Sequence, residues 1–210
     1  MYLSDFKRTC KVISNLFARP LIAPKYFFSL FNQRSPIELK LPWWSYDAIY
    51  YVNKSTYESC FEWGSGGSTL FLAKKCKRIT TIENDIQWHN KLKKELKKNH
   101  FENVNLLYKE TNLDNPDSFQ NSAYLNSLNK NYDLIVIDGE DNFGPDSTWS
   151  ARVLCFERAQ CFINPSGIII VDDSWRYPEI EEQSEARSIC RFESLGPSRK
   201  GVTRTDIHLY

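Results

Sequence analysis

The sequence predicts an α/β fold in which helices cover both faces of a mostly parallel sheet. From Tyr57 onward, short apolar runs alternate with longer segments of helical character, which is typical of chains that build parallel sheets. The apolar runs are continuous instead of alternating with polar residues. This pattern indicates strands with both faces buried.

Seven strands account for the apolar runs. The first, Ser59–Trp63, ends abruptly at a glycine-rich turn. The two most apolar strands are Tyr132–Asp138 and Gly167–Asp172, with the sequences YDLIVID and GIIIVD. The others are predicted at Arg78–Glu83, Val104–Tyr108, Ile189–Ser194 and Asp206–Tyr210, and the last two form a pair.

Helices are predicted between these strands at Thr69–Lys75, Ile86–Asn99 and Ser150–Phe162. A turn at residues 164–167 (NPSG) ends the last of them. One more helix precedes the first strand and begins near Ser45, since serine is a favoured residue at a helix N-terminus.

Residues 1–56 are predicted to form a helical extension, and residues 57–210 a single domain. Positions 10–31 are apolar and basic, but Pro20 and Pro24 prevent one long helix there. Two interpretations of this segment remain open. It is either a strap of short helices packed on the domain or an anchor at a membrane surface.

The composition is that of a soluble globular protein, with 41% apolar and 25% charged residues. No stretch approaches the ~18 apolar residues of a membrane span, and the six dispersed cysteines suggest reduced thiols in a cytoplasmic protein. The net charge of +1 gives little support to a nucleic-acid partner. Homo-oligomerisation stays open.

The first strand leads into a glycine-rich turn, EWGSGGST at residues 62–69. Glycines there let the backbone approach a ligand closely, beside the N-terminus of the next helix. A dinucleotide fingerprint has a third glycine where this chain has Thr69. Glu83, at the end of the second strand, is placed to accept hydrogen bonds from the ribose hydroxyls of a nucleoside bound over the turn.

The carboxylate at Glu62 would repel a pyrophosphate but suits a ligand with an amino group and a sulfonium. In these features the chain resembles the class I S-adenosylmethionine-dependent methyltransferases from about Leu41 to Tyr210. The resemblance implies a Rossmann-like, seven-stranded methyltransferase fold with an antiparallel last strand, and S-adenosylmethionine as the cofactor. It implies these cofactor-binding residues, with Glu110 near the adenine: Glu62, Gly64, Ser65, Gly66, Ser68, Thr69, Glu83, Glu110 and Asp138.

Three aspartates follow the two most apolar strands: Asp138, Asp172 and Asp173. The carboxyl ends of strands in an open α/β sheet face the ligand crevice, so we expect these aspartates to be catalytic. Carboxylates that converge raise one another's pKa unless a cation neutralises them, and oxygen ligands suit Mg²⁺. The alternative to a metal site is that Asp138 contacts the cofactor or caps a helix, while Asp172 and Asp173 lie in a solvated turn.

The loop after the aspartate pair is predicted to contact substrate through Trp175 and Arg176, since loops at strand ends often bind ligands. We expect Trp43, Trp44 and Tyr177 to join Trp175 in an aromatic rim. The aspartate pair resembles that of the macrocin-type, metal-dependent sugar O-methyltransferases, and uncharacterised bacterial relatives share the first motif.

The resemblance thus implies methyl transfer to a sugar hydroxyl of a glycan or glycolipid precursor. Two alternatives remain: O- or N-methylation of a small phenolic or amine metabolite, and a non-catalytic cofactor-binding protein. An RNA methyltransferase is disfavoured by the near-neutral charge.

Overall fold

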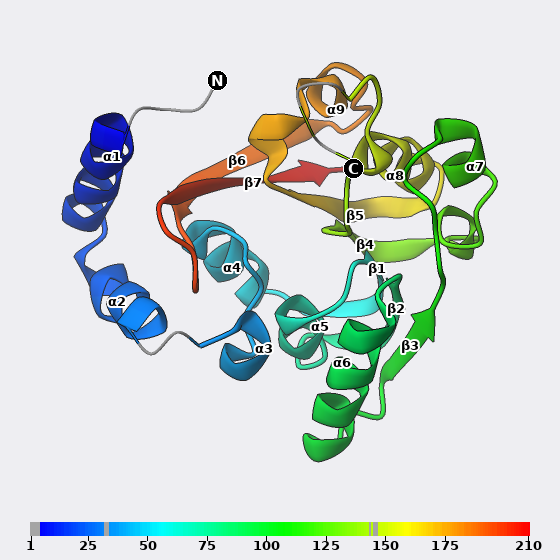
Figure 1. Ribbon diagram of the computed structural model, residues 1–210, viewed down its shortest axis with the longest axis horizontal. Coiled ribbons are helices and arrows are strands. Elements are labelled where there is room, and N and C mark those ends of the chain that lie inside the picture. Colours follow the sequence, from blue (N-terminus) through cyan, green and yellow to red (C-terminus); the bar gives the residue numbers. More distant parts are fainter. Residues whose placement is uncertain (1–4, 32–33, 143, 145–146) are drawn as a thin grey trace.

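The computed structural model describes residues 5–31, 34–142, 144 and 147–210. All seven predicted strands are present: β1 (Tyr57–Trp63), β2 (Cys76–Glu83), β3 (Val104–Tyr108), β4 (Tyr132–Ile137), β5 (Ile163–Asp172), β6 (Ser188–Leu195) and β7 (Val202–Leu209). They form one sheet in the order β3-β2-β1-β4-β5-β7-β6 (Figure 1). β7 pairs antiparallel with both β5 and β6 and so points opposite to the other six strands. The predicted mostly parallel sheet with an antiparallel last strand is confirmed.

The predicted turn at residues 164–167 is wrong in one respect. β5 begins at Ile163, which pairs with Tyr132, and the next pair is Leu134 with Ile168. The intervening residues form an irregularity inside the strand, in which Ser166 has a φ of 67°. The Asn-Pro-Ser-Gly sequence therefore bends a strand instead of ending a helix.

Helices lie on both faces of the sheet (Figure 1). Their bounds are α1 (Asp5–Ala18), η1 (Pro20–Ile22), α2 (Ala23–Phe31), α3 (Pro36–Leu39), α4 (Tyr46–Asn53), α5 (Gly67–Leu72), α6 (Ile86–Lys98), α7 (Pro116–Gln120), η2 (Leu125–Ser127), α8 (Ala151–Gln160), η3 (Ser174–Arg176) and α9 (Pro178–Glu182). The Ser45 hydroxyl accepts a hydrogen bond from the Ala48 backbone N–H, so the predicted start of α4 is confirmed.

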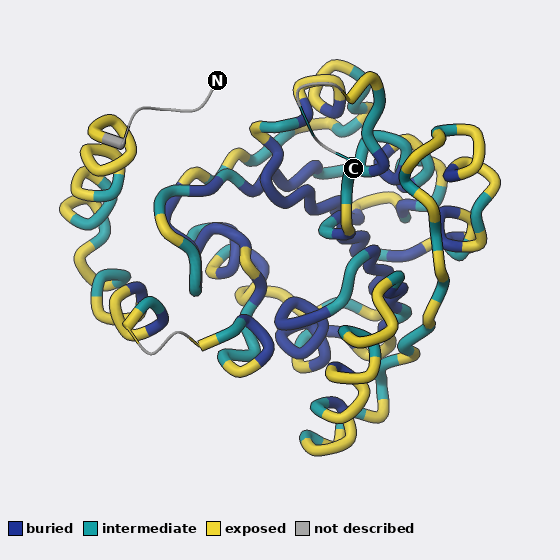
Figure 2. Tube along the Cα trace, in the orientation of Figure 1, coloured by how far each residue is buried: buried dark blue, intermediate teal, exposed yellow. Residues whose placement is uncertain are grey.

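The central strands divide their side chains between two buried clusters. Along β4, Ile135 and Ile137 face α7, α8 and α9, whereas Leu134 and Val136 face α4 and α5. Successive side chains of a strand point to opposite faces, so a strand that is apolar throughout is buried on both. Figure 2 shows the strands of the sheet centre buried and the outer helices largely exposed.

The N-terminal helices pack on the sheet by one side only. Tyr26 and, in part, Val12 and Leu16 join the core cluster that contains α4. Several large apolar side chains of the same helices stay exposed: Phe6, Ile13, Phe17, Leu21, Phe27, Phe28 and Phe31. None of the described helices is long and apolar enough to cross a membrane.

Candidate active site

A cavity of about 390 Å³ lies at the carboxyl edge of the sheet. The turn between β1 and α5 forms its floor, Glu83 at the end of β2 lines one side, and Asp138, next after β4, lines another. The cavity thus lies where β1 separates β2 from β4, at the point where the strand order reverses. Open α/β sheets bind ligands at this position.

Two glycines allow the turn to fold tightly. Gly64 has a φ of 81°, and a Cβ there would lie 2.6 Å from the Asp138 carbonyl oxygen. At Gly67 a Cβ would lie 2.1 Å from the Leu41 carbonyl oxygen. A side chain at either position would collide with backbone, so the cradle depends on glycine at both.

Glu83 is buried and its carboxylate organises this turn. One oxygen accepts from the Ser65 backbone N–H at 3.1 Å and from the Ser65 hydroxyl at 2.6 Å. The other accepts from the backbone N–H groups of Asn84 and Asp85, both at 2.9 Å. The Ser65 hydroxyl therefore occupies one of the acceptor positions of this carboxylate.

Glu62 and Thr69 lie behind the turn and do not line the cavity. The Thr69 hydroxyl donates to the Glu62 carboxylate at 2.6 Å and accepts from the Gly66 N–H at 3.0 Å. The second carboxylate oxygen of Glu62 is buried without a hydrogen-bond partner among the described residues. Burial raises the pKa of Glu62 to about 7, against the opposing effect of its hydroxyl neighbours.

The other predicted cofactor residues divide into two groups. Gly64, Ser65, Gly66, Ser68 and Asp138 line the cavity with Glu83. Glu110 does not, because β3 at the sheet edge ends at Tyr108 and the next residues carry Glu110 out to solvent.

Sequence reasoning missed the indole that closes the same side of the cavity. Trp88 on α6 donates from Nε1 to the Ser65 carbonyl oxygen at 2.5 Å and lines the cavity. Asp85 caps α6 by accepting from the Trp88 N–H at 2.7 Å. The available signal was a tryptophan in the first turn of the helix that follows Glu83.

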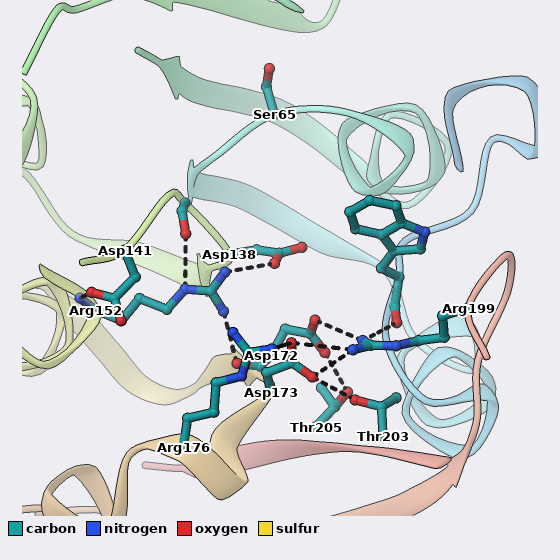
Figure 3. A network of polar contacts seen from close by, with 12 residues as sticks. Ser65, Asp138, Asp141, Arg152, Asp172, Asp173, Arg176, Arg199, Thr203 and Thr205 are labelled. Atoms are coloured by element: carbon teal, nitrogen blue, oxygen red, sulfur yellow. Dashed lines mark hydrogen bonds and ion pairs between the residues drawn. The ribbon is translucent and has the colours of Figure 1, made fainter. Parts of the chain in front are cut away.

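The structure brings the three predicted aspartates to adjacent strand ends, but each contacts an arginine (Figure 3). Arg152 of α8 approaches from one side. Its guanidinium lies 3.4 Å from Asp138 and donates to the carbonyl oxygens of Gly139 and Asp172 at 2.8 and 2.9 Å.

Arg199, from the loop between β6 and β7, approaches the pair from the opposite side (Figure 3). It lies 2.9 Å from Asp173 and 3.6 Å from Asp172, and it donates to the Trp43 carbonyl oxygen at 3.2 Å. Thr205 donates to Asp172 at 2.9 Å and Thr203 to Asp173 at 2.8 Å.

These contacts set the pKa values of the three carboxyls. Burial and the neighbouring Asp172 raise the pKa of Asp138 well above its usual range. Burial and Asp173 likewise raise the pKa of Asp172. Burial alone would raise the pKa of Asp173, but Arg199, Thr203 and Arg176 together lower it.

The predicted Mg²⁺ site does not fit this arrangement. Guanidinium groups already supply the positive charge that we had expected from a metal, and hydroxyl donors occupy further carboxylate oxygens. Within the described part of the chain, no group of three histidine, cysteine or acidic side chains is arranged to hold a metal ion. The sequence could not reveal this, because Arg152 comes from α8 and Arg199 from the β6–β7 loop, and no sequence pattern relates either residue to the aspartates.

The predicted substrate residues Trp175 and Arg176 lie together on η3, with the guanidinium 5.1 Å from the indole centroid. They line a second cleft and not the first cavity. The predicted aromatic rim is wrong in part, because Trp44 and Tyr177 are buried in the core. Trp43 is 49% exposed and lines the first cavity.

No protein-family model and no curated protein matches the chain. Solved structures do. A candidate O-methyltransferase from Klebsiella pneumoniae has a TM-score of 0.61 at 14% identity, covering 97% of this chain and 98% of that one. A candidate methyltransferase from Streptococcus mutans in complex with S-adenosylhomocysteine gives 0.54 at 11%, covering 84% and 99%. A candidate rRNA methylase from Clostridium thermocellum gives 0.55 at 13%, covering 78% and 96%. The chain therefore has the Rossmann-like methyltransferase fold that its sequence predicts.

Proposed function

We propose that the protein is an S-adenosylmethionine-dependent methyltransferase that methylates an oxygen atom. One observation carries the proposal: the glycine cradle, the buried Glu83 and Asp138 converge on a single cavity at the strand-order reversal. The Streptococcus mutans relative in fold binds S-adenosylhomocysteine, which supports the same ligand here.

The residues present fit this cofactor. The cradle at Gly64 and Gly67 leaves no room for side chains but admits a ligand against its backbone. The carboxylate of Glu83 would accept hydrogen bonds from the ribose hydroxyls in place of the Ser65 hydroxyl, and Trp88 and Asn84 line the same cavity beside it. Bound there, S-adenosylmethionine supplies an electrophilic methyl group on a sulfonium.

In this proposal Asp138 accepts the proton of the acceptor hydroxyl. It is the aspartate of the three that lines the cavity, and its raised pKa makes its carboxylate a stronger base than usual. Arg152 holds the carboxylate in place from below. Holding donor and acceptor in line supplies up to about 7–11 kcal/mol of the rate acceleration in ideal cases.

For the acceptor, we propose a sugar hydroxyl of a glycan or glycolipid precursor. Trp43 beside the cavity and Trp175 beside the second cleft offer flat apolar faces, and each is more than 40% exposed. Glu140, which accepts from Asn84 at 2.8 Å, adds a polar group at the rim. Phenols, amines and RNA are the competing acceptors. The test measures methyl transfer to each of them and to sugar acceptors under identical conditions.

Calorimetric titration with S-adenosylhomocysteine tests the cofactor site. Glu83→Gln removes a charged acceptor, so we expect Kd to rise about 10- to 100-fold. Ser65→Ala is the matched control, because it removes the competing hydroxyl and leaves the carboxylate. Its Kd should stay within about threefold of the wild-type value. Equal Kd values for the wild type and Glu83→Gln would place the ligand elsewhere.

A further inference from the structure

A second cleft, of about 460 Å³, lies between α1, η3 and the β6–β7 hairpin. Six of its lining residues are cations: Arg8, Lys11, Arg176, Arg199, Lys200 and Arg204. The lining includes one acid, Glu193. This concentration of positive charge contrasts with a chain whose net charge is +1.

Part of this charge is already balanced. Lys11 pairs with Glu193 at 2.7 Å and Arg204 with Asp206 at 3.5 Å. Arg176 and Arg199 share Asp173, at 3.3 and 2.9 Å.

Arg8 and Lys200 are different, since neither has an ion pair with any described residue and both are exposed. The residues that line the cleft thus include six cations and one acid, and two of the cations hold no ion pair with a described residue. Two such cations suit a phosphate monoester, which carries a charge of about −1.5 to −2 near neutral pH.

An exposed indole completes the cleft. Trp175 is 43% exposed, and Arg176 lies over its ring. A flat apolar surface beside a cationic pocket suits a ligand that carries both a ring and an anion, such as a phosphorylated sugar.

The cleft adjoins the candidate active site through one side chain. Arg199 lines the cleft and forms ion pairs with both Asp172 and Asp173. It also donates a hydrogen bond to the backbone carbonyl of Trp43, and Trp43 lines the first cavity. Ser198, beside Arg199, is itself tied to the Ser29 hydroxyl and the Arg34 carbonyl oxygen. The β6–β7 loop that carries Arg199 is therefore held to the N-terminal segment by hydrogen bonds from Ser198 and Arg199.

We propose that this cleft binds the phosphate or diphosphate group of the acceptor, so that the substrate is a phosphorylated sugar or a phosphate-linked glycan lipid. The identity of the ligand as the acceptor rests on the proposed function. The anion site itself rests on the charges and geometry of the cleft.

The test is titration calorimetry at low salt with inorganic pyrophosphate, uridine diphosphate glucose and glucose. Arg8→Gln and Lys200→Gln remove the two cations that hold no ion pair, so they leave the aspartate network intact. Each should weaken binding of both phosphorylated probes three- to tenfold, and glucose alone should not bind measurably. Lys94→Gln, on the exposed face of α6, removes the same charge away from the cleft and should change nothing.

Vesicles separate the two sources of the anion. If phosphatidylglycerol vesicles, but not uridine diphosphate glucose, bind in a manner sensitive to Lys200→Gln, the cleft takes a lipid-borne phosphate. Sensitivity with the soluble probe assigns a free phosphorylated sugar. Equal affinity of every probe for the wild type and both cleft variants would overturn the proposal.

S-adenosylhomocysteine titrated into the same variants distinguishes the two proposals. Its affinity should be unchanged by Lys200→Gln. Pyrophosphate binding that depends on Lys200, in a protein that binds no S-adenosylhomocysteine, would refute the methyltransferase proposal and leave the anion site standing.

Discussion

Glu83 and Asp172 are both buried carboxylates at the carboxyl ends of parallel strands, yet their partners differ in kind and in distance along the chain. Glu83 is held by neutral donors from Ser65, Asn84 and Asp85, which lie within 18 residues of it. Asp172 is held by Thr205, 33 residues away, and by the charge of Arg199.

One side of the site is therefore stabilised by neutral hydrogen-bond donors, and the other by charge compensation from arginines on other elements. Removing a neutral donor from a carboxylate costs about 1.5–3 kcal/mol, the range for a hydrogen bond to a charged group. Removing one partner of a buried ion pair leaves an uncompensated charge and costs about 3–5 kcal/mol. Experiments on the arginines therefore test the comparison most severely.

The largest effect is expected for Arg152→Met. The variant leaves Asp138 without its cation and leaves the carbonyl oxygens of Gly139 and Asp172 without their donor. We expect the free energy of unfolding to fall by about 2–5 kcal/mol, because two buried carbonyl oxygens lose their donor at about 1–3 kcal/mol each, measured by urea denaturation at neutral pH.

The control is the double variant Asp138→Asn/Arg152→Met, which removes the stranded carboxylate as well. It should recover part of the lost stability, because an uncharged amide is less costly to bury than an unpaired carboxylate. A loss below about 1 kcal/mol in the single variant would show that the aspartates do not depend on guanidinium compensation.

The same difference decides what the sequence could predict. The glycine turn and Glu83 were predictable because their relationship is set by a strand, a turn and the next strand, all within residues 59–83. The positions of the three aspartates in the fold were also predictable, because each lies at the end of an apolar strand or directly after it. Their arginine partners were not, because no pattern links a helix residue or a hairpin loop to a carboxylate on another strand.

Burial produced the remaining errors. Trp44 and Tyr177 lie beside exposed aromatic residues in sequence, yet they point into the two core clusters. For these two aromatic residues side-chain direction, which only the packed sheet determines, decided the outcome. Glu110 differs, because β3 ends at Tyr108 as predicted and Glu110, assigned by resemblance, is exposed and does not line the cavity.

The second prediction concerns the pH dependence of stability on the glycine-turn side of the site, at Glu62. Its pKa is raised by burial from 4.5 to about 7, so folding favours the protonated carboxyl. That stabilisation is complete below pH 4.5 and is lost as the pH rises to about 7. Between pH 5 and pH 7 the loss amounts to about 2 kcal/mol of unfolding free energy.

Glu62→Gln should remove this loss, because glutamine resembles the protonated acid at every pH. Urea denaturation of the wild type and the variant at pH 5, 6 and 7 measures the difference between their slopes. Parallel pH profiles would mean that Glu62 titrates in the folded protein as it does in the unfolded chain.

The last prediction expects no effect at all, and it bears directly on the carboxylate side. The three aspartates already have positively charged partners, the guanidinium groups of Arg152 and Arg199. A divalent cation would have to displace both guanidinium groups, and the threonine hydroxyls already donate to oxygens that it would need. Excess EDTA should therefore leave both the melting temperature and the methyl-transfer rate unchanged, and added Mg²⁺ should not raise either.

Arg199→Met makes the test discriminating, because it opens one side of the aspartate pair. If Mg²⁺ stabilises Arg199→Met but not the wild type, the arginine fills the position that a metal would otherwise take. If Mg²⁺ stabilises the wild type and Asp172→Asn abolishes that stabilisation, the site is a metal site after all, and the two sides of the cavity differ less than their partners suggest.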